Sequence, residues 1–94
     1  MENSIVTFLE KLENADNIAK SEIENKLVNF GTEAVPELVN QLQVVKGTKR
    51  GVVAMTLIRI GEGSIDYLKK AARDNKDFEW VANYLISEIN CKVA

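Results

Sequence analysis

An all-α fold is predicted for this chain by three features: the spacing of its apolar residues, the placement of glycine and proline, and an internal repeat. Apolar residues recur three and four positions apart along the chain, and they nowhere alternate long enough to indicate a strand. Gly31 and Gly61 follow such segments and Pro36 opens one, as is typical of helix ends and helix starts. The chain has 94 residues, which suits one domain and is too short for two. We therefore expect a single all-α domain over residues 1–94.

Three helices are expected in the first half. The first covers about residues 4–13, and residues 14–17 (Asn-Ala-Asp-Asn) form a turn in which Asp16 or Asn17 caps the second helix. That helix stops at Gly31, a residue suited to the left-handed conformation, and the third helix begins near Pro36. The apolar positions expected to face the core are Ile5, Phe8, Leu9, Leu12, Ile23, Leu27, Phe30, Val35, Leu38, Val39 and Leu42.

Three more helices are expected in the second half. Thr48 is the candidate cap of the fourth helix, and Gly61 ends it. A fifth helix follows residues 62–64, and Asp77 is the candidate cap of a sixth helix that runs to about residue 90. The expected core positions here are Val53, Leu57, Ile60, Ile65, Leu68, Ala71, Ala72, Val81, Leu85 and Ile89.

The helices repeat with a period of about thirty residues. Residues 27–38 match residues 57–68 position by position, and the same offset relates Ile5 to Val35 and Ile65. The last unit continues at an offset of 28, so that its inner turn is two residues shorter. Repeated helical hairpins that share one buried pattern are typical of an α-solenoid. We expect three stacked hairpins, at about residues 3–31, 33–61 and 63–91.

Two segments resemble the short HEAT-like repeats that also occur in the phycobilisome bilin-lyase proteins. Residues 31–38 are similar to the turn and first helix of such a repeat, and residues 50–61 to its second helix. The matching positions of the second helix are Arg50, Val53, Thr56, Leu57, Ile60 and Gly61. The resemblance covers about residues 16–74; Lys20 replaces the arginine in the first unit, and the third unit lacks both the arginine and the final glycine. It implies an α-solenoid whose second helices line a concave binding surface.

Helical phasing then defines the candidate partner-binding surface. It consists of the positions next to the core residues on the second helix of each unit: Glu22, Asn25, Asn29, Val52, Met55, Arg59, Trp80, Asn83 and Ser87. Tryptophan and arginine are common anchors of protein interfaces, and methionine adapts to irregular partners. The alternative interpretation is that Met55 and Trp80 fill gaps between neighbouring hairpins. Lys69, Lys70 and Arg73 are expected on the opposite, convex side.

The composition excludes most catalytic chemistry. The chain has no histidine, which excludes Ser-His-Asp and Cys-His sites and every metal site that needs imidazole. It has one cysteine, Cys91, which excludes an intrachain disulfide, a Cys-only zinc site and an iron–sulfur cluster within one chain. The carboxylate pairs Glu33/Glu37 and Glu62/Asp66 are interpreted as favourable charge at helix N-termini. We expect no enzyme, no cofactor and no metal.

The charge pattern bears on partners and location. The net charge is −2, but residues 1–40 carry eight acidic and three basic residues, whereas residues 41–94 carry six and nine. This polarity favours oriented docking, while the acidic balance and the lack of interleaved aromatic residues argue against nucleic acid. The sequence shows no apolar run long enough for a signal peptide or a membrane span, so that we expect a cytoplasmic protein.

The expected function is a small, non-catalytic adaptor or scaffold that binds another protein on its concave helical surface. One alternative is a structural module that forms a homo-oligomer by stacking through its end repeats, where Val6, Tyr67, Tyr84 and Ile86 offer apolar side chains. A second alternative is a lyase-like accessory role, which only the resemblance to the bilin-lyase proteins suggests.

Overall fold

The computed structural model describes residues 2–93, and the side chains of residues 5–91. Between residues 2 and 93 the chain forms helices and short connections without a strand, which confirms the all-α class. The α-helices are α1 (Glu2–Lys11), α2 (Asn17–Asn29), α3 (Val35–Leu42), α4 (Thr48–Ile60), α5 (Ile65–Asp74) and α6 (Glu79–Val93). Short 3-10 segments join them: η1 (Leu12–Asn14), η2 (Gly31–Ala34), η3 (Gly61–Ser64) and η4 (Lys76–Phe78).

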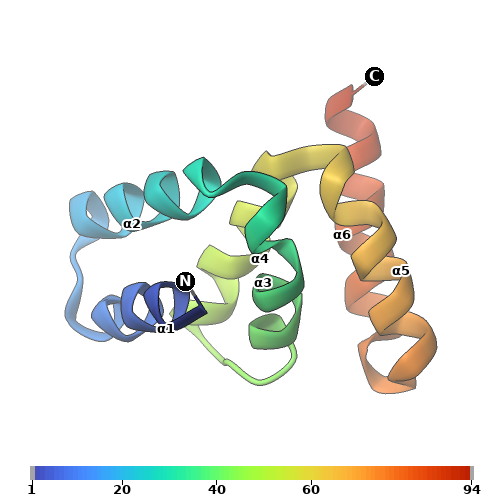
Figure 1. Ribbon diagram of the computed structural model, residues 1–94, viewed down its shortest axis with the longest axis horizontal. Helices are drawn as coiled ribbons and strands as arrows, with labels where there is room; N and C mark the ends of the chain where they lie inside the picture. Colours follow the sequence, from blue (N-terminus) through green and yellow to red (C-terminus); the bar gives the residue numbers. More distant parts are fainter. Residues whose placement is uncertain (1, 94) are drawn as a thin grey trace.

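The helices form two series of neighbours, α1, α3 and α5 in one and α2, α4 and α6 in the other (Figure 1). Helix α3 contacts α1 and α5, and helix α4 contacts α2 and α6. Each helix also packs against the one that follows or precedes it across a turn, as in the pairs α1 with α2, α3 with α4, and α5 with α6. The molecule measures 32 × 28 × 23 Å along its principal axes. The central helices α3 and α4 are therefore covered on two flanks, whereas the outer helices have open sides.

Several helix boundaries follow the predicted residues. The Asp16 side chain caps α2, because its Oδ1 accepts a hydrogen bond from the Ala19 N–H at 2.8 Å. Pro36 lies in the first turn of α3. Gly31 and Gly61 both have positive φ, at 70° and 87°. Gly61 combines this φ with a ψ of −139°, which is not the left-handed helical region but an extended conformation that favours glycine.

Two predicted caps are wrong. Thr48 is the first helical residue of α4 and not its cap. The cap is Gly47, one residue earlier, which has a φ of 62°. Asp77 was the candidate cap of the sixth helix, but it lies within η4, and α6 begins at Glu79. Its side chain accepts no capping hydrogen bond. Instead, Asn75 Oδ1 accepts from the Asp77 N–H at 3.2 Å, because the chain is extended at Asn75 and begins to coil at Lys76.

The core runs through all the α-helices. Most predicted core residues are buried, and Phe8, Phe30, Ile60 and Ile65 pack against the core while half-buried. Leu27, Leu57 and Leu85, which the sequence pattern aligns with one another, are all fully buried. Additional buried residues, which the periodicity did not predict, are Ala34, Val52, Thr56, Ile58, Ser64, Phe78 and Ala82.

The buried polar side chains are satisfied within the molecule. Thr56 Oγ1 donates to the Val52 carbonyl one turn earlier at 2.7 Å, and Ser64 Oγ donates to the Leu57 carbonyl at 2.9 Å. Among the side chains of residues 5–91, no buried nitrogen or oxygen lacks a hydrogen-bond partner. A buried polar group without a partner would cost about 1–3 kcal/mol, so these contacts matter for stability.

The turns η2 and η3 approach each other closely. A Cβ atom added at Gly63 would overlap with Thr32 Cγ2, whereas a Cβ at Gly31 or Gly61 would meet no atom within 4 Å. A side chain at Gly63 would therefore require the exposed Thr32 side chain to move, whereas Gly31 and Gly61 favour glycine because of their positive φ.

Candidate partner-binding surface

The nine predicted surface residues lie on three helices that pack in a row. Helix α2 carries Glu22, Asn25 and Asn29, helix α4 carries Val52, Met55 and Arg59, and helix α6 carries Trp80, Asn83 and Ser87. On each helix the three residues are spaced by three or four positions, so that they share one face. Since α4 contacts both α2 and α6, the three helices are neighbours.

Met55 and Trp80 are exposed. Trp80 retains 71% of its accessible surface and Met55 retains 44%, so that neither side chain is buried as a filler between helices. Glu22, Asn25, Asn29, Arg59, Asn83 and Ser87 are also exposed. Eight of the nine predicted residues are therefore exposed to solvent.

Val52 is the exception, and its predicted exposure is wrong. The side chain is only 8% exposed and belongs to the core. Helix α4 packs between α2 and α6, so that residues on its flanks are covered as well as those on its inner side. Val52, Thr56 and Ile58 are all buried for this reason. Val52 stabilises the fold and offers almost no surface to a partner.

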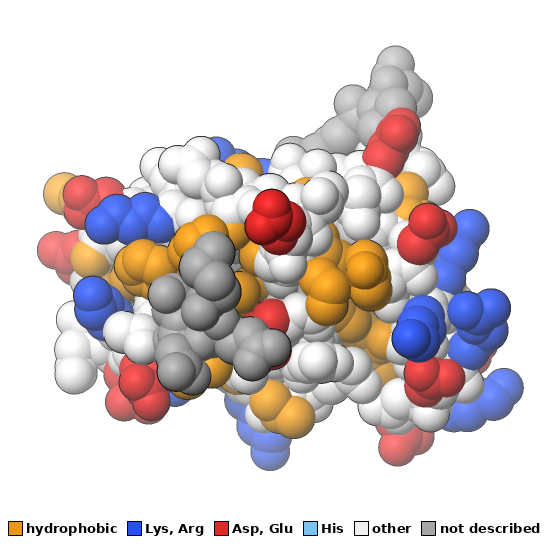
Figure 2. Space-filling view, viewed as in Figure 1, with side chains coloured by type: hydrophobic (Ala, Val, Ile, Leu, Met, Phe, Trp, Pro, Cys, Tyr) orange, Lys and Arg blue, Asp and Glu red, His pale blue; other side chains and the backbone are white. Residues whose placement is uncertain are grey.

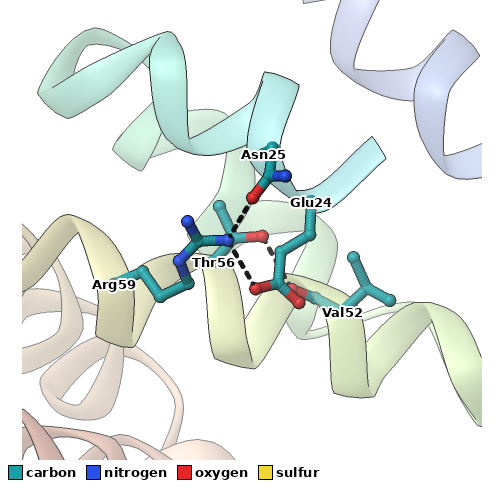
Figure 3. A network of polar contacts seen from close by, with 5 residues as sticks. All are labelled: Glu24, Asn25, Val52, Thr56 and Arg59. Carbon is teal, nitrogen blue, oxygen red and sulfur yellow. Dashed lines mark hydrogen bonds and ion pairs between the residues drawn. The ribbon is translucent and has the colours of Figure 1, made fainter. Parts of the chain in front are cut away.

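Arg59 links two of the helices that form this surface (Figure 3). Its Nη1 donates to Glu24 Oε2 and to Asn25 Oδ1, both at 2.8 Å. The Arg59 side chain is 38% exposed and that of Glu24 is 21% exposed, so the pair is partly shielded from solvent. Arg59 therefore joins α4 to α2, and its charge is balanced by Glu24.

Sequence reasoning brought Arg59 and Asn25 onto one surface but missed Glu24. An offset of exactly one repeat aligns Arg59 with Asn29, whereas the bonded residues lie about one helical turn earlier on α2. The opposite charges of Glu24 and Arg59 were the only available signal. Charge alone does not reveal which turn of one helix lies beside which turn of another.

Two further apolar residues on the same helices are exposed; Ile18 was not predicted as a surface residue, and Tyr84 was expected only at an open end of the stack. Ile18 precedes Glu22 by one turn of α2, and Tyr84 follows Trp80 by one turn of α6; both are largely exposed. The four-residue spacing could have identified them. We use the name α2–α4–α6 surface for the exposed set Ile18, Glu22, Asn25, Asn29, Met55, Arg59, Trp80, Asn83, Tyr84 and Ser87.

The remaining candidate residues are distributed elsewhere. Val6 and Ile86, expected at open ends, are half-buried, and Tyr67 on α5 is exposed. Lys69, Lys70 and Arg73 are exposed on α5. Within the described part of the chain, no cluster of three or more acidic or cysteine residues is placed to hold a metal ion. The same residues include no helix with the length and hydropathy needed to cross a membrane.

Comparisons with known proteins give no relative for this chain. No protein-family model matches it, and neither the curated proteins nor the solved structures include a significant match.

Proposed function

We propose that this chain is a HEAT-like α-solenoid of three stacked helical hairpins that binds another protein and catalyses no reaction. The hairpins would be the pairs α1 with α2, α3 with α4, and α5 with α6. The packing order supports this arrangement, because α1, α3 and α5 contact in succession and so do α2, α4 and α6. The recurrence of buried leucines at Leu27, Leu57 and Leu85 supports it too.

The observation that carries the proposal is the exposure of four large apolar side chains on the α2–α4–α6 surface. Ile18, Met55, Trp80 and Tyr84 all lie on these helices and all face solvent. Apolar side chains gathered on one face and bordered by polar residues mark interaction sites in soluble proteins. Tryptophan and tyrosine contribute most to such interfaces, because a rigid ring buries a large area at a low cost in conformational entropy.

The polar residues of this surface suggest how a partner is held. Asn29, Asn83 and Ser87 are exposed and uncharged, and their side chains can both donate and accept hydrogen bonds. Arg59 is already paired with Glu24, so that its charge is not free to pair with a partner. A partner that buries Trp80 and Tyr84 would bind mainly through apolar contact, with little dependence on salt concentration.

The test is quantitative recovery of bound proteins by the tagged full-length chain and its variants. Trp80→Ala combined with Tyr84→Ala should lower recovery of a specific partner at least about tenfold, because each aromatic anchor contributes about 2 kcal/mol. Both side chains are exposed, so the helical content measured by circular dichroism should be unchanged.

The matched control is Val44→Ala, which shortens an exposed apolar side chain in the connection between α3 and α4. This variant should recover the partner as well as the unaltered chain does. Equal recovery by the Trp80/Tyr84 double variant would rule out the α2–α4–α6 surface as the binding site.

A further inference from the structure

An apolar groove lies between α1 and α3, and none of its lining residues belongs to the α2–α4–α6 surface. Its volume is about 350 Å³, and its apolar lining consists of Ile5, Phe30, Ala34 and Pro36. The first three are buried or half-buried, whereas Pro36 is exposed at the edge of the groove. The groove therefore has room for one long side chain of a partner, with its aliphatic part against these residues.

Two carboxylates line this groove, and no cation accompanies them. Glu33 and Glu37 are lining residues, Asn40 is the neutral polar one, and the described lining contains no lysine or arginine. Glu37 accepts a hydrogen bond from the neutral Gln41 amide at 2.9 Å, and neither carboxylate forms an ion pair with a described residue. Figure 2 shows acidic side chains near the middle of the view, without a lysine or arginine of the described residues beside them. The two negative charges are therefore not balanced within the groove.

The start of helix α3 explains the sign of these charges but not the groove. Glu33 precedes α3 and Glu37 lies in its first turn, where negative charge is favourable. Glu62 and Asp66 have the corresponding places at the start of α5. Neither of these two residues lines the groove between α3 and α5. The combination of two carboxylates with an apolar groove is thus a feature of the α1–α3 side and not of every helix start.

Phe30 adds an aromatic ring to the same groove. Its ring packs against that of Phe8, with the centroids 6.0 Å apart. Lys11 and Lys26 place their Nζ atoms 5.5 and 5.7 Å from the centroid of the Phe8 ring. These are the cations found over an aromatic ring among the described residues, and neither lies over Phe30. Phe30 can therefore receive a cation from a partner, which is a second feature that favours a positively charged ligand.

We propose that this groove binds an arginine side chain of a partner protein, in a segment where apolar residues flank that arginine. Charge complementarity selects a cation, because Glu33 and Glu37 are the charged lining residues. A guanidinium has five N–H donors for the two carboxylates and a planar face that stacks on a ring such as that of Phe30. Its methylene stem fits the apolar lining at Ile5 and Ala34. A lysine ammonium is a compact charge without such a face, so that arginine is the preferred ligand.

This site is separate from the one in the proposed function. It shares no residue with the α2–α4–α6 surface. The Trp80→Ala/Tyr84→Ala variant should therefore bind an arginine peptide as tightly as the unaltered chain does, and failure of either proposal is visible independently of the other.

The first experiment is a titration of the full chain with a short peptide, followed by the backbone amide signals in NMR spectra. The probe is the acetylated and amidated peptide Gly-Leu-Arg-Leu-Gly, which should shift the signals of Phe30, Glu33 and Glu37 in a saturable way. A peptide with citrulline, the neutral isostere of arginine, should bind at least about tenfold more weakly, because it lacks the charge. A peptide with lysine should bind at least about threefold more weakly than the arginine peptide.

The second experiment removes the two charges. Glu33→Gln combined with Glu37→Gln keeps the size of both side chains and should weaken binding of the arginine peptide at least about fivefold. The matched control is Glu62→Gln, which makes the same change in η3 before α5 and should leave the affinity unaltered. Neither glutamate of the groove is buried, so the helical content measured by circular dichroism should stay the same.

Several results would overturn this proposal. One is the absence of saturable shifts at millimolar peptide, and another is equal affinity for the arginine and citrulline peptides. Unaltered binding by the Glu33→Gln/Glu37→Gln variant would show that the carboxylates do not hold the ligand. Equal affinity for the lysine peptide would contradict the preference for arginine. Shifts confined to residues around Trp80 would place the peptide on the α2–α4–α6 surface instead.

Discussion

Single glycine residues control how the helices of this molecule follow one another. Gly61 ends α4 with φ at 87° and ψ at −139°, a combination that residues with a side chain rarely adopt. Nothing lies within 4 Å of a Cβ added there, so that a substitution would act through the backbone alone. Gly51 offers a contrast on the same helix, since it is helical, exposed and equally unobstructed.

Alanine should therefore have opposite effects at these two positions. Gly61→Ala should lower the free energy of unfolding by about 1–3 kcal/mol, because it strains the backbone. Gly51→Ala should raise it by about 0.5–1 kcal/mol, because alanine loses less conformational entropy in a helix. Urea denaturation followed by circular dichroism measures both. Effects of the same sign would show that the conformation at Gly61 is not the reason for its glycine.

At the scale of helices, the ion pair between Arg59 and Glu24 holds α4 beside α2. Because both side chains keep contact with solvent, the pair should contribute little. Arg59→Ala should lower the free energy of unfolding by at most about 1 kcal/mol. A double-mutant cycle with Glu24→Gln should give a coupling energy of about 0.5 kcal/mol, and this energy should shrink at high salt. Lys46→Ala, an exposed charge in the connection before α4, is the control and should show no coupling to Glu24→Gln.

On the scale of the whole molecule, one continuous core joins the helices, and Leu57 of α4 is fully buried within it. Leu57→Ala should lower the free energy of unfolding by about 2–5 kcal/mol. That is a large share of the about 5–15 kcal/mol that stabilises a typical domain. Met55→Ala, two residues away and exposed, should cost less than about 1 kcal/mol. Thermal denaturation should show one transition in each case; separate loss of some helices would contradict a single core.

The distribution of net charge along the chain changes when it is counted over three segments of about thirty residues and not over two halves. Residues 1–31 have a net charge of −3, residues 32–61 of +2 and residues 62–94 of −1. The basic excess that distinguishes the two halves of the sequence thus belongs to the middle of the chain and not to its C-terminal end. End-to-end docking by charge therefore gains no support from this distribution.

The sequence by itself determined the helices, most of the core and the residues that end the helices. These features depend on interactions between near neighbours: the 3.6-residue period places apolar side chains on one face, and glycine permits positive φ. Leu27, Leu57, Gly31 and Gly61 were predicted on this basis and have these roles. Local capping was predicted less well, because Thr48 and Asp77 each had a neighbour that could serve instead.

Only the tertiary structure decided which residues of the second helices face solvent. The sequence pattern aligns Val52 with Trp80, but Val52 is buried and Trp80 is exposed. The ion pair between Arg59 and Glu24 likewise depends on which turns of α2 and α4 lie side by side. Burial on a helix flank depends on the neighbouring helix and its position along the axis, and a periodic pattern within one helix carries no information about either.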